Sequence, residues 1–154
     1  RLAVTTGPGT FTGQRVGLAF MRGLRLALQK PLIGVTTLEA MAAATQAPRA
    51  AAIHDARRGE AYLLLWEDGQ TRLAPAVMPF TQAVAAIRAF GPCALAGTGA
   101  CLAAETLGGA FAMTGIEQPD ALWVARLARG RAAPDTPPGP LYLRAPDAKL
   151  PAAR

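Results

Sequence analysis

The sequence of 154 residues is poor in the residues that most often carry chemistry. It has one histidine and two cysteines, and 6% of its residues are aromatic. Cys93 and Cys101 are too few for a disulfide scaffold and do not form a C-x-x-C pair, so a reduced, cytoplasmic chain is expected. No apolar run approaches the roughly 18–20 residues of a membrane span, and no stretch has the pattern of a secretory signal. The sequence therefore predicts a globular chain without a membrane segment.

Negative charge is also scarce. There are 16 Lys and Arg against 10 Asp and Glu, which gives a formal net charge of +6 at pH 7. Such a balance is compatible with nucleic-acid binding. The basic residues are scattered, however, and only Arg57 and Arg58 are adjacent, so charge alone does not predict a dedicated site. With 51% hydrophobic and 17% charged residues, the chain can bury a core and is not intrinsically disordered.

The spacing of apolar residues and chain breakers predicts alternating strands and helices. Short strands are expected over residues 2–6 and 32–35, each followed by a helix, the first over about residues 11–29. Thr36 or Thr37 is placed to cap the second helix, with Glu39 in a capping box. This order of elements is typical of an α/β layer.

A boundary is expected at residues 46–49, which divides the chain into domains of residues 1–47 and 48–154. Two strands, over residues 51–55 and 60–66, then flank a hairpin turn. The remaining expected elements are a strand over residues 72–78, a helix over 80–90, a strand over 93–96, helices over 99–107 and 119–130, an irregular loop over 132–140, and an extended, then proline-rich, mobile tail.

The most informative stretch is the loop GPGTFTGQRVG, residues 7–17, between the first strand and the first helix. Backbone N–H groups at a helix N-terminus favour an anion, so a phosphate loop is one interpretation. The loop matches neither G-x-x-x-x-G-K-[ST] nor G-x-G-x-x-G, in which Thr12 stands at the third glycine. The alternative is a tight turn followed by a helix cap, with glycine supplying the backbone geometry. Spacing alone leaves both open.

The helix that follows has an unusually wide apolar arc. At 100° per residue, one narrow strip of the helix holds Gln14, Arg15, Leu18, Arg22 and Arg25. The apolar remainder spans roughly 220°, whereas a surface helix typically buries about 100°. One sheet cannot cover this arc, so either another helix of the protein or a partner is expected against it. Gly13 and Gly17, four residues apart, would let a helix approach closely.

The ionisable residues form no recognisable catalytic motif. A zinc site of His54, Cys93 and Cys101, or a Cys–His nucleophile pair, has no supporting spacing. Asp55 and Glu60 bracket the hairpin turn, where a salt bridge to the arginines between them is preferred over a carboxylate pair. We therefore predict no catalytic residue, no metal and no cofactor.

Four segments, in family order, resemble the TsaB (YeaZ) family. Residues 7–19 (GPGTFTGQRVGLA) resemble the signature GPGSFTG-x-R-[IV]-G, and residues 32–40 (LIGVTTLEA) resemble I-G-V-S-[ST]-L. Residues 53–62 (IHDARRGEAY) are similar to I-D-A-R-x-G-E-V-Y, with His54 as a departure, and residues 140–144 (PLYLR) are similar to P-x-Y-L-R. The matching loop residues are Gly7, Pro8, Gly9, Thr10, Phe11, Thr12 and Arg15.

The resemblance implies an α/β fold of the actin/Hsp70-like sugar-kinase superfold, with mixed sheets flanked by helices. It implies a non-catalytic partner of the enzyme TsaD, which with TsaE installs N6-threonylcarbamoyladenosine beside the anticodon of ANN-decoding tRNAs. Contact with tRNA would be indirect, through the complex. Pairing in the family uses a helix bundle, and isolated chains would form a homodimer. The partner-binding residues implied here are Gly13, Val16, Gly17, Phe20, Met21 and Leu24.

The family opens with an I-D-T-S strand, two further strands and a helix that have no counterpart here. The N-terminal subdomain is therefore expected to be incomplete. In active members of the superfold a glycine-rich turn contacts the adenosine, and the turn Gly97-Thr98-Gly99 is the matching place. Two other function classes stay open: a hydrolase or ATPase of the same superfold, labelled glycoprotease-like or peptidase M22-like, and a tRNA-binding protein driven by charge.

Overall fold

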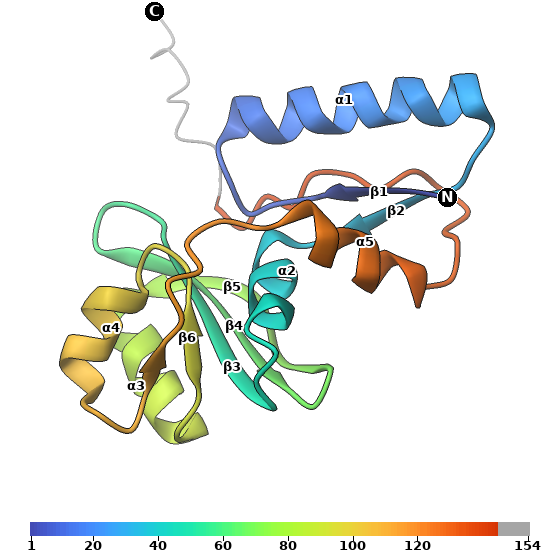
Figure 1. Ribbon diagram of the computed structural model, residues 1–154. Coiled ribbons are helices and arrows are strands. Elements are labelled where there is room, and N and C mark those ends of the chain that lie inside the picture. Colours follow the sequence, from blue (N-terminus) through green and yellow to red (C-terminus); the bar gives the residue numbers. More distant parts are fainter. Residues whose placement is uncertain (145–154) are drawn as a thin grey trace, which may run out of the picture.

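Residues 1–144 form two sheets and five helices. The computed structural model describes residues 1–144, so the proline-rich part of the expected tail lies outside the described residues. The smaller sheet has two parallel strands, β1 (Leu2–Thr5) and β2 (Leu32–Val35), with Leu2 opposite Leu32. The larger sheet has the order β5-β4-β3-β6-β7 (Figure 1). Among residues 1–144, no helix has the length and apolar character needed to cross a membrane.

Around the smaller sheet, strands and helices alternate along the chain as the sequence predicts. Helix α1 (Phe11–Leu28) connects β1 to β2 and ends one turn before Pro31, with Gln29 in the left-handed region at φ 50°. Helix α2 (Thr37–Ala44) starts at Thr36, which forms the predicted capping box with Glu39. Local capping and breaking signals thus set the ends of both helices.

The larger sheet begins as an antiparallel meander and ends in parallel strands. Its elements, with the helices between them, are β3 (Arg49–Asp55), β4 (Glu60–Glu67), β5 (Gln70–Pro79), α3 (Phe80–Phe90), β6 (Ala94–Ala96), α4 (Ala100–Leu107), β7 (Ala112–Met113) and, last, α5 (Ala121–Arg129). Strand β7, which pairs in parallel with β6, is absent from the sequence prediction. A two-residue strand is too short to show any periodicity.

Helices cover both faces of the larger sheet. On one face α3 and α4 bury Ile53, Leu63 and Leu95, all at 0% exposure. On the other face α2 packs its Leu38 and Met41 against β3 and β4. Because α2 packs on the larger sheet, a different helix is left to cover the lower face of the smaller one.

That helix is α5, which is last in sequence. Its Val124 and Ala128 pack against Ile33 and Val35 of β2. The smaller sheet therefore lies between α1 above and α5 below, as Figure 1 shows. Helix α2 precedes the expected boundary between residues 47 and 48 but packs on the larger sheet, and α5 follows it but packs on the smaller sheet. Residues 1–47 and 48–144 therefore contribute to common hydrophobic clusters.

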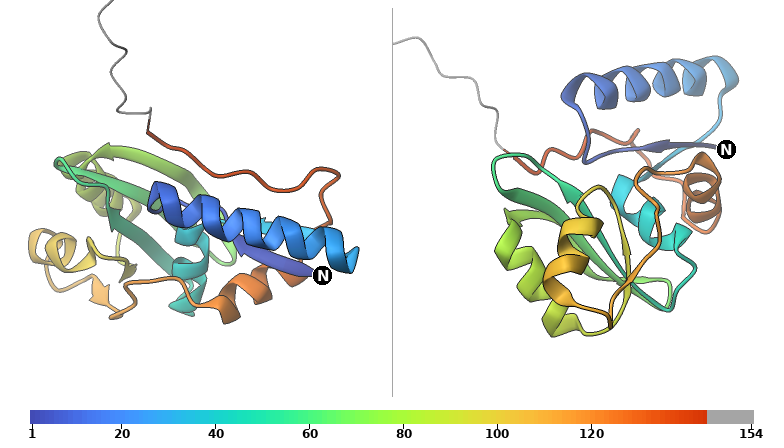
Figure 2. Two further views of the ribbon diagram at one scale, coloured as in Figure 1. Left: turned by 90° about the horizontal axis from the view of Figure 1, so that it is seen from above. Right: turned by 60° about the vertical axis from the view of Figure 1, so that its left-hand side comes forward.

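Helix α1 contacts the chain through an unexpected face. Leu18 is its one buried residue, at 3% exposure, and packs with Val4 and Leu32. Leu18 belongs to the narrow strip that also carries the arginines. In that strip Gln14 and Arg25 are half-buried, whereas Arg15 and Arg22 are exposed. Val16, Ala19 and Phe20 of the apolar arc are exposed, whereas Gly17, Met21 and Leu24 are half-buried. The helix itself lies along the outside of the molecule, above β1 in the right-hand view of Figure 2.

We expect Leu18→Ala to lower the free energy of unfolding by about 2–5 kcal/mol, because it leaves a cavity between α1 and the smaller sheet. Phe20→Ala, on the same helix but 65% exposed, is the matched control and should change it by about 0.5 kcal/mol or less. Chemical denaturation measures both. Equal losses for the two variants would contradict the inward orientation of Leu18.

Candidate functional site: the outer face of α1 and the end where the motifs meet

The outer face of α1 exposes large apolar side chains. Val16 is 63% exposed, Phe20 65% and Leu26 71%. Val16 and Phe20, four residues apart, lie on one side of the helix, and exposed apolar patches mark protein interaction sites. Within the described residues nothing packs over this face.

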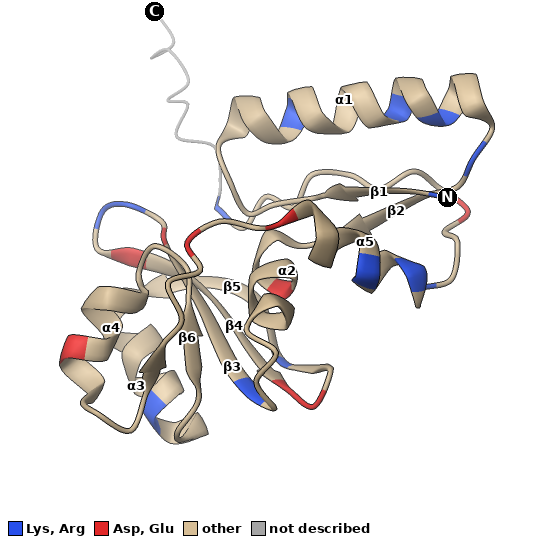
Figure 3. Cartoon of the chain, in the orientation of Figure 1, with Lys and Arg blue, Asp and Glu red and all other residues tan. Residues whose placement is uncertain are grey.

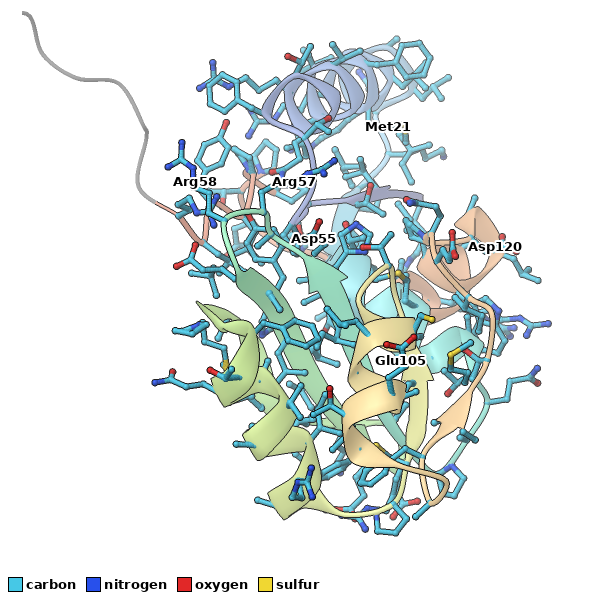
Figure 4. All side chains as sticks on the ribbon, turned by 90° about the vertical axis from the view of Figure 1, so that its left-hand side faces the viewer. Met21, Asp55, Arg57, Arg58, Glu105 and Asp120 are labelled. Atoms are coloured by element: carbon cyan, nitrogen blue, oxygen red, sulfur yellow. The ribbon has the colours of Figure 1, made fainter. Side chains whose placement is uncertain are left out.

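The six partner-binding residues predicted from the resemblance fall into two groups. Gly13, Val16 and Phe20 are exposed, whereas Gly17, Met21 and Leu24 are half-buried. Met21 packs at the margin of the cluster formed by Val4, Leu18 and Leu32, and Figure 4 shows it directed down from the helix toward the smaller sheet. The first group lies on open surface, and the second lines the flank of the helix.

The glycine loop is fixed by its own polar groups. The Thr10 hydroxyl accepts from the N–H of Gly13 at 3.2 Å, and Gln14 Nε2 donates to the carbonyl of Gly9 at 2.9 Å. Gly7 has φ 110°, and a Cβ there would lie 2.7 Å from the Gln14 side chain. These contacts favour the interpretation as a tight turn and helix cap over a phosphate loop.

The last described segment, residues 131–144, is here named the C-terminal strap. It runs beside the smaller sheet toward the start of α1 (Figure 1). Leu141 N–H donates to the carbonyl of Thr6 at 2.7 Å, and Arg22 donates to the carbonyl of Pro138 at 2.9 Å. The arginine strip of α1 therefore binds the strap.

Three of the four motif segments meet at one end of the molecule. Arg15 lies over the ring of Phe11, with 3.5 Å from its Cζ to the ring centroid, and its Nε donates to the Tyr142 hydroxyl at 2.8 Å. The rings of Phe11 and Tyr142 stack with centroids 5.7 Å apart. Arg144 of the strap forms an ion pair with Glu60 of the hairpin. The glycine loop, the hairpin and the strap are thus tied together.

A cavity of about 630 Å³ lies between these three segments. Its lining consists of Pro8, Gly9, Phe11, Gln14, Arg15, Tyr62, Leu141, Tyr142, Leu143 and Arg144. The pairings that form it join residues more than 80 positions apart, so no local pattern could predict them. The order of the motif segments was the one available signal that they belong to a common site.

The hairpin turn confirms the salt-bridge interpretation. Arg57 lies 3.8 Å from the Asp55 carboxylate, and its N–H donates to Asp55 Oδ1 at 2.8 Å. Glu60 is engaged by Arg144 instead of facing Asp55. Each of the two carboxylates therefore contacts an arginine, as the salt-bridge interpretation predicts.

The histidine and the two cysteines lie in different environments. Cys93 is buried, and burial raises the pKa of its thiol to about 11, so it is inert near neutral pH. Cys101 is exposed on α4. Among residues 1–144 no group of three or more His, Cys, Asp and Glu is placed to hold a metal ion.

His54 occupies a structural position on β3. Its Nδ1 accepts from the N–H of Thr98 at 3.4 Å, in the turn Gly97–Gly99. A Cβ at Gly97 would clash with the carbonyl of Ile53, so glycine there permits the turn to approach β3. Burial lowers the pKa of His54, an effect that the nearby Asp55 charge opposes. The neutral ring is therefore the form that the fold accommodates.

The lowered pKa of His54 predicts a pH-dependent stability. Between the folded pKa and the unfolded value near 6.5, the unfolded chain binds more protons, so the free energy of unfolding falls as the pH falls through this window. The comparison is denaturation of the parent and of His54→Gln from pH 7.5 to 5. The parent should lose more stability on acidification than the variant. Parallel pH profiles would contradict this role of His54.

Comparison with known proteins places the chain. The family model described as TsaD, tRNA N6-adenosine threonylcarbamoyltransferase, matches residues 1–112. This chain belongs to the TsaD family. The tRNA threonylcarbamoyladenosine biosynthesis protein TsaB of Escherichia coli (strain K12) is 46% identical over 65 residues, which are 40% of this chain and 28% of that protein. The predicted resemblance to TsaB (YeaZ) is confirmed.

Two further relatives in the TsaD family match most of the chain. An uncharacterized protein of Mycobacterium tuberculosis is 34% identical over 152 residues, 96% of this chain and 65% of its own length. The crystal structure of a Pseudomonas aeruginosa protein with similarity to peptidase YeaZ superposes with a TM-score of 0.71 at 31% identity, over 91% of this chain and 71% of that one. The predicted actin-like α/β class of the TsaD family is thereby confirmed. The chain spans less than a third of the E. coli relative that it matches.

Proposed function

We propose that this chain acts in the formation of tRNA threonylcarbamoyladenosine as a TsaB-type, cytoplasmic subunit. The names of its relatives support this proposal, since the E. coli relative is the tRNA threonylcarbamoyladenosine biosynthesis protein TsaB. The observation that carries the proposal is the outward apolar face of α1. Val16 and Phe20 are 63% and 65% exposed on this helix, and large apolar side chains exposed together are typical of a surface that contacts another chain.

The proposed partner is TsaD, which α1 joins in a helix bundle, with TsaE as a further member of the complex. Val16 and Phe20 would supply the buried centre, each contributing about 1.5–3 kcal/mol on burial. Gly13 leaves room for a neighbouring backbone, and the half-buried Met21 and Leu24 border the contact. Without TsaD, the same face would form a symmetric homodimer. We further propose that residues 1–47 and 48–154 belong to two actin-like subdomains.

The proposed role is non-catalytic. Among the described residues, Cys93 is buried with a raised pKa, and His54 is held neutral against the Thr98 turn. Asp55 and Glu60 each hold an arginine. A buried thiol with a raised pKa is a poor nucleophile, which supports a binding role.

Pairing is tested by size-exclusion chromatography with light scattering, on this chain mixed with TsaD of the same organism. The double variant Val16→Glu/Phe20→Glu should raise the Kd of the complex by roughly 100-fold or more, because an unpaired buried charge costs about 3 kcal/mol or more. The control is Leu102→Glu/Leu122→Glu on α4 and α5, which places the same two charges at comparably exposed leucines, 55% and 52% exposed. It should pair like the parent.

Retained pairing by the double variant, with circular dichroism equal to that of the parent, would overturn the assignment of α1. Isothermal titration of the chain with Mg-ATP tests the alternative of an ATPase of the same superfold. A flat titration removes that alternative, whereas a saturable signal with turnover would replace the subunit proposal.

A further inference from the structure

We propose that the end of the molecule where the three motifs meet binds the phosphate backbone of tRNA directly. This inference rests on the proposed function, which supplies the RNA, but it uses none of the outer face of α1. It also differs from the indirect tRNA contact that the family resemblance implies. The residues concerned lie in the glycine loop with the start of α1, in the hairpin and in the strap. The proposed pairing with TsaD gives these three segments no role.

Positive charge gathers at this end from three separate segments. Arg15 comes from α1, Arg57 and Arg58 from the β3–β4 turn, and Arg144 from the strap, against two acids, Asp55 and Glu60. The count is four positive charges minus two negative, a net +2. Figure 3 shows the basic turn on the same side of the molecule as the start of α1. The fold thus concentrates arginines that are scattered in the sequence.

The turn presents its arginines from a fixed base. Arg57 and Arg58 both have left-handed backbone, at φ 66° and 57°. The N–H of Glu60 donates to the carbonyl of Arg57 at 3.1 Å, and Asp55 accepts the N–H of Arg57. The Arg57 side chain is 87% exposed, and its 3.8 Å contact with Asp55 is a weak solvent-exposed pair that a phosphate can compete with. Both arginines are exposed residues, and Figure 4 labels them at the turn.

Exposed aromatic rings lie beside this charge. Phe11 is 56% exposed and Tyr142 46%, and the two rings stack beneath Arg15. The cavity of about 630 Å³ that they line opens next to Arg144, whose guanidinium donates to the Arg57 carbonyl at 3.5 Å. Arginine forks bind phosphate oxygens, and exposed rings stack on unpaired bases. The combination fits an RNA segment whose backbone follows the turn and whose bases reach the rings.

The test is fluorescence anisotropy of labelled tRNA that decodes an ANN codon, titrated with the 154-residue chain from 50 to 200 mM salt. The variant is Arg57→Asn/Arg58→Asn, since asparagine tolerates the left-handed backbone of the turn. Loss of two phosphate contacts should weaken binding roughly tenfold and reduce the slope of log affinity against log salt by about 1.4. The control, Arg126→Gln/Arg129→Gln, removes the same charge from α5 and should bind like the parent.

Three results would overturn the proposal. The first is unchanged tRNA binding by the turn variant. The second is an equal loss of affinity for the turn variant and the α5 variant, which would mean attraction by net charge alone. The third is displacement of tRNA by Mg-ATP at matched ionic strength, with an affinity for Mg-ATP that the turn variant abolishes, which would make this end a nucleotide site.

The two proposals fail separately. The turn variant should still co-elute with TsaD, and Val16→Glu/Phe20→Glu should still bind tRNA as an isolated chain. If the turn variant lost TsaD and kept tRNA, the arginines would belong to a protein interface, and the RNA proposal would be wrong. Circular dichroism and the thermal midpoint of each variant show whether it is folded.

Discussion

Arg15 and Arg22 bind α1 to the C-terminal strap, and this contact decides which face of the helix the protein keeps for itself. An amphipathic helix normally turns its apolar side to the core. Here Leu18 packs inward, and two neighbouring arginines of the same strip bond to the Tyr142 hydroxyl and the Pro138 carbonyl. The strap thus supplies polar partners to arginines that remain exposed, and Val16 and Phe20 of the apolar arc stay outside.

The strap also joins the two sheets of the molecule. Arg131 at its start donates to the Gly34 carbonyl and pairs with Glu39, the acid of the α2 capping box. Arg144 at its end pairs with Glu60 on the hairpin of the larger sheet. One irregular segment therefore fixes α1, β2, α2 and β4 relative to one another. An irregular segment with this many partners has a structural role that its proline-rich sequence does not reveal.

Local signals predicted most of the elements, and long-range contacts explain what was missed. The Thr36–Glu39 capping box and the Lys30–Pro31 break set helix ends from a few neighbouring residues. Helix α5 covers the smaller sheet through contacts between residues about 90 positions apart. Leu18 points inward because it packs with Val4 and Leu32, and no local pattern records that packing. The same holds for the candidate site: the width of the apolar arc was readable, but the meeting of Arg15, Tyr142 and Glu60 was not.

The distance along the chain between Arg15 and Tyr142 has a consequence for biosynthesis. The two residues are 127 positions apart, and at 5–20 residues per second a ribosome needs roughly 6–25 s to synthesise the chain between them. During that time Arg15 and Arg22 lack the partners that the strap supplies, and α1 is held only by its contacts with the smaller sheet. The contacts between α1 and the strap therefore form only after nearly the whole chain has been synthesised.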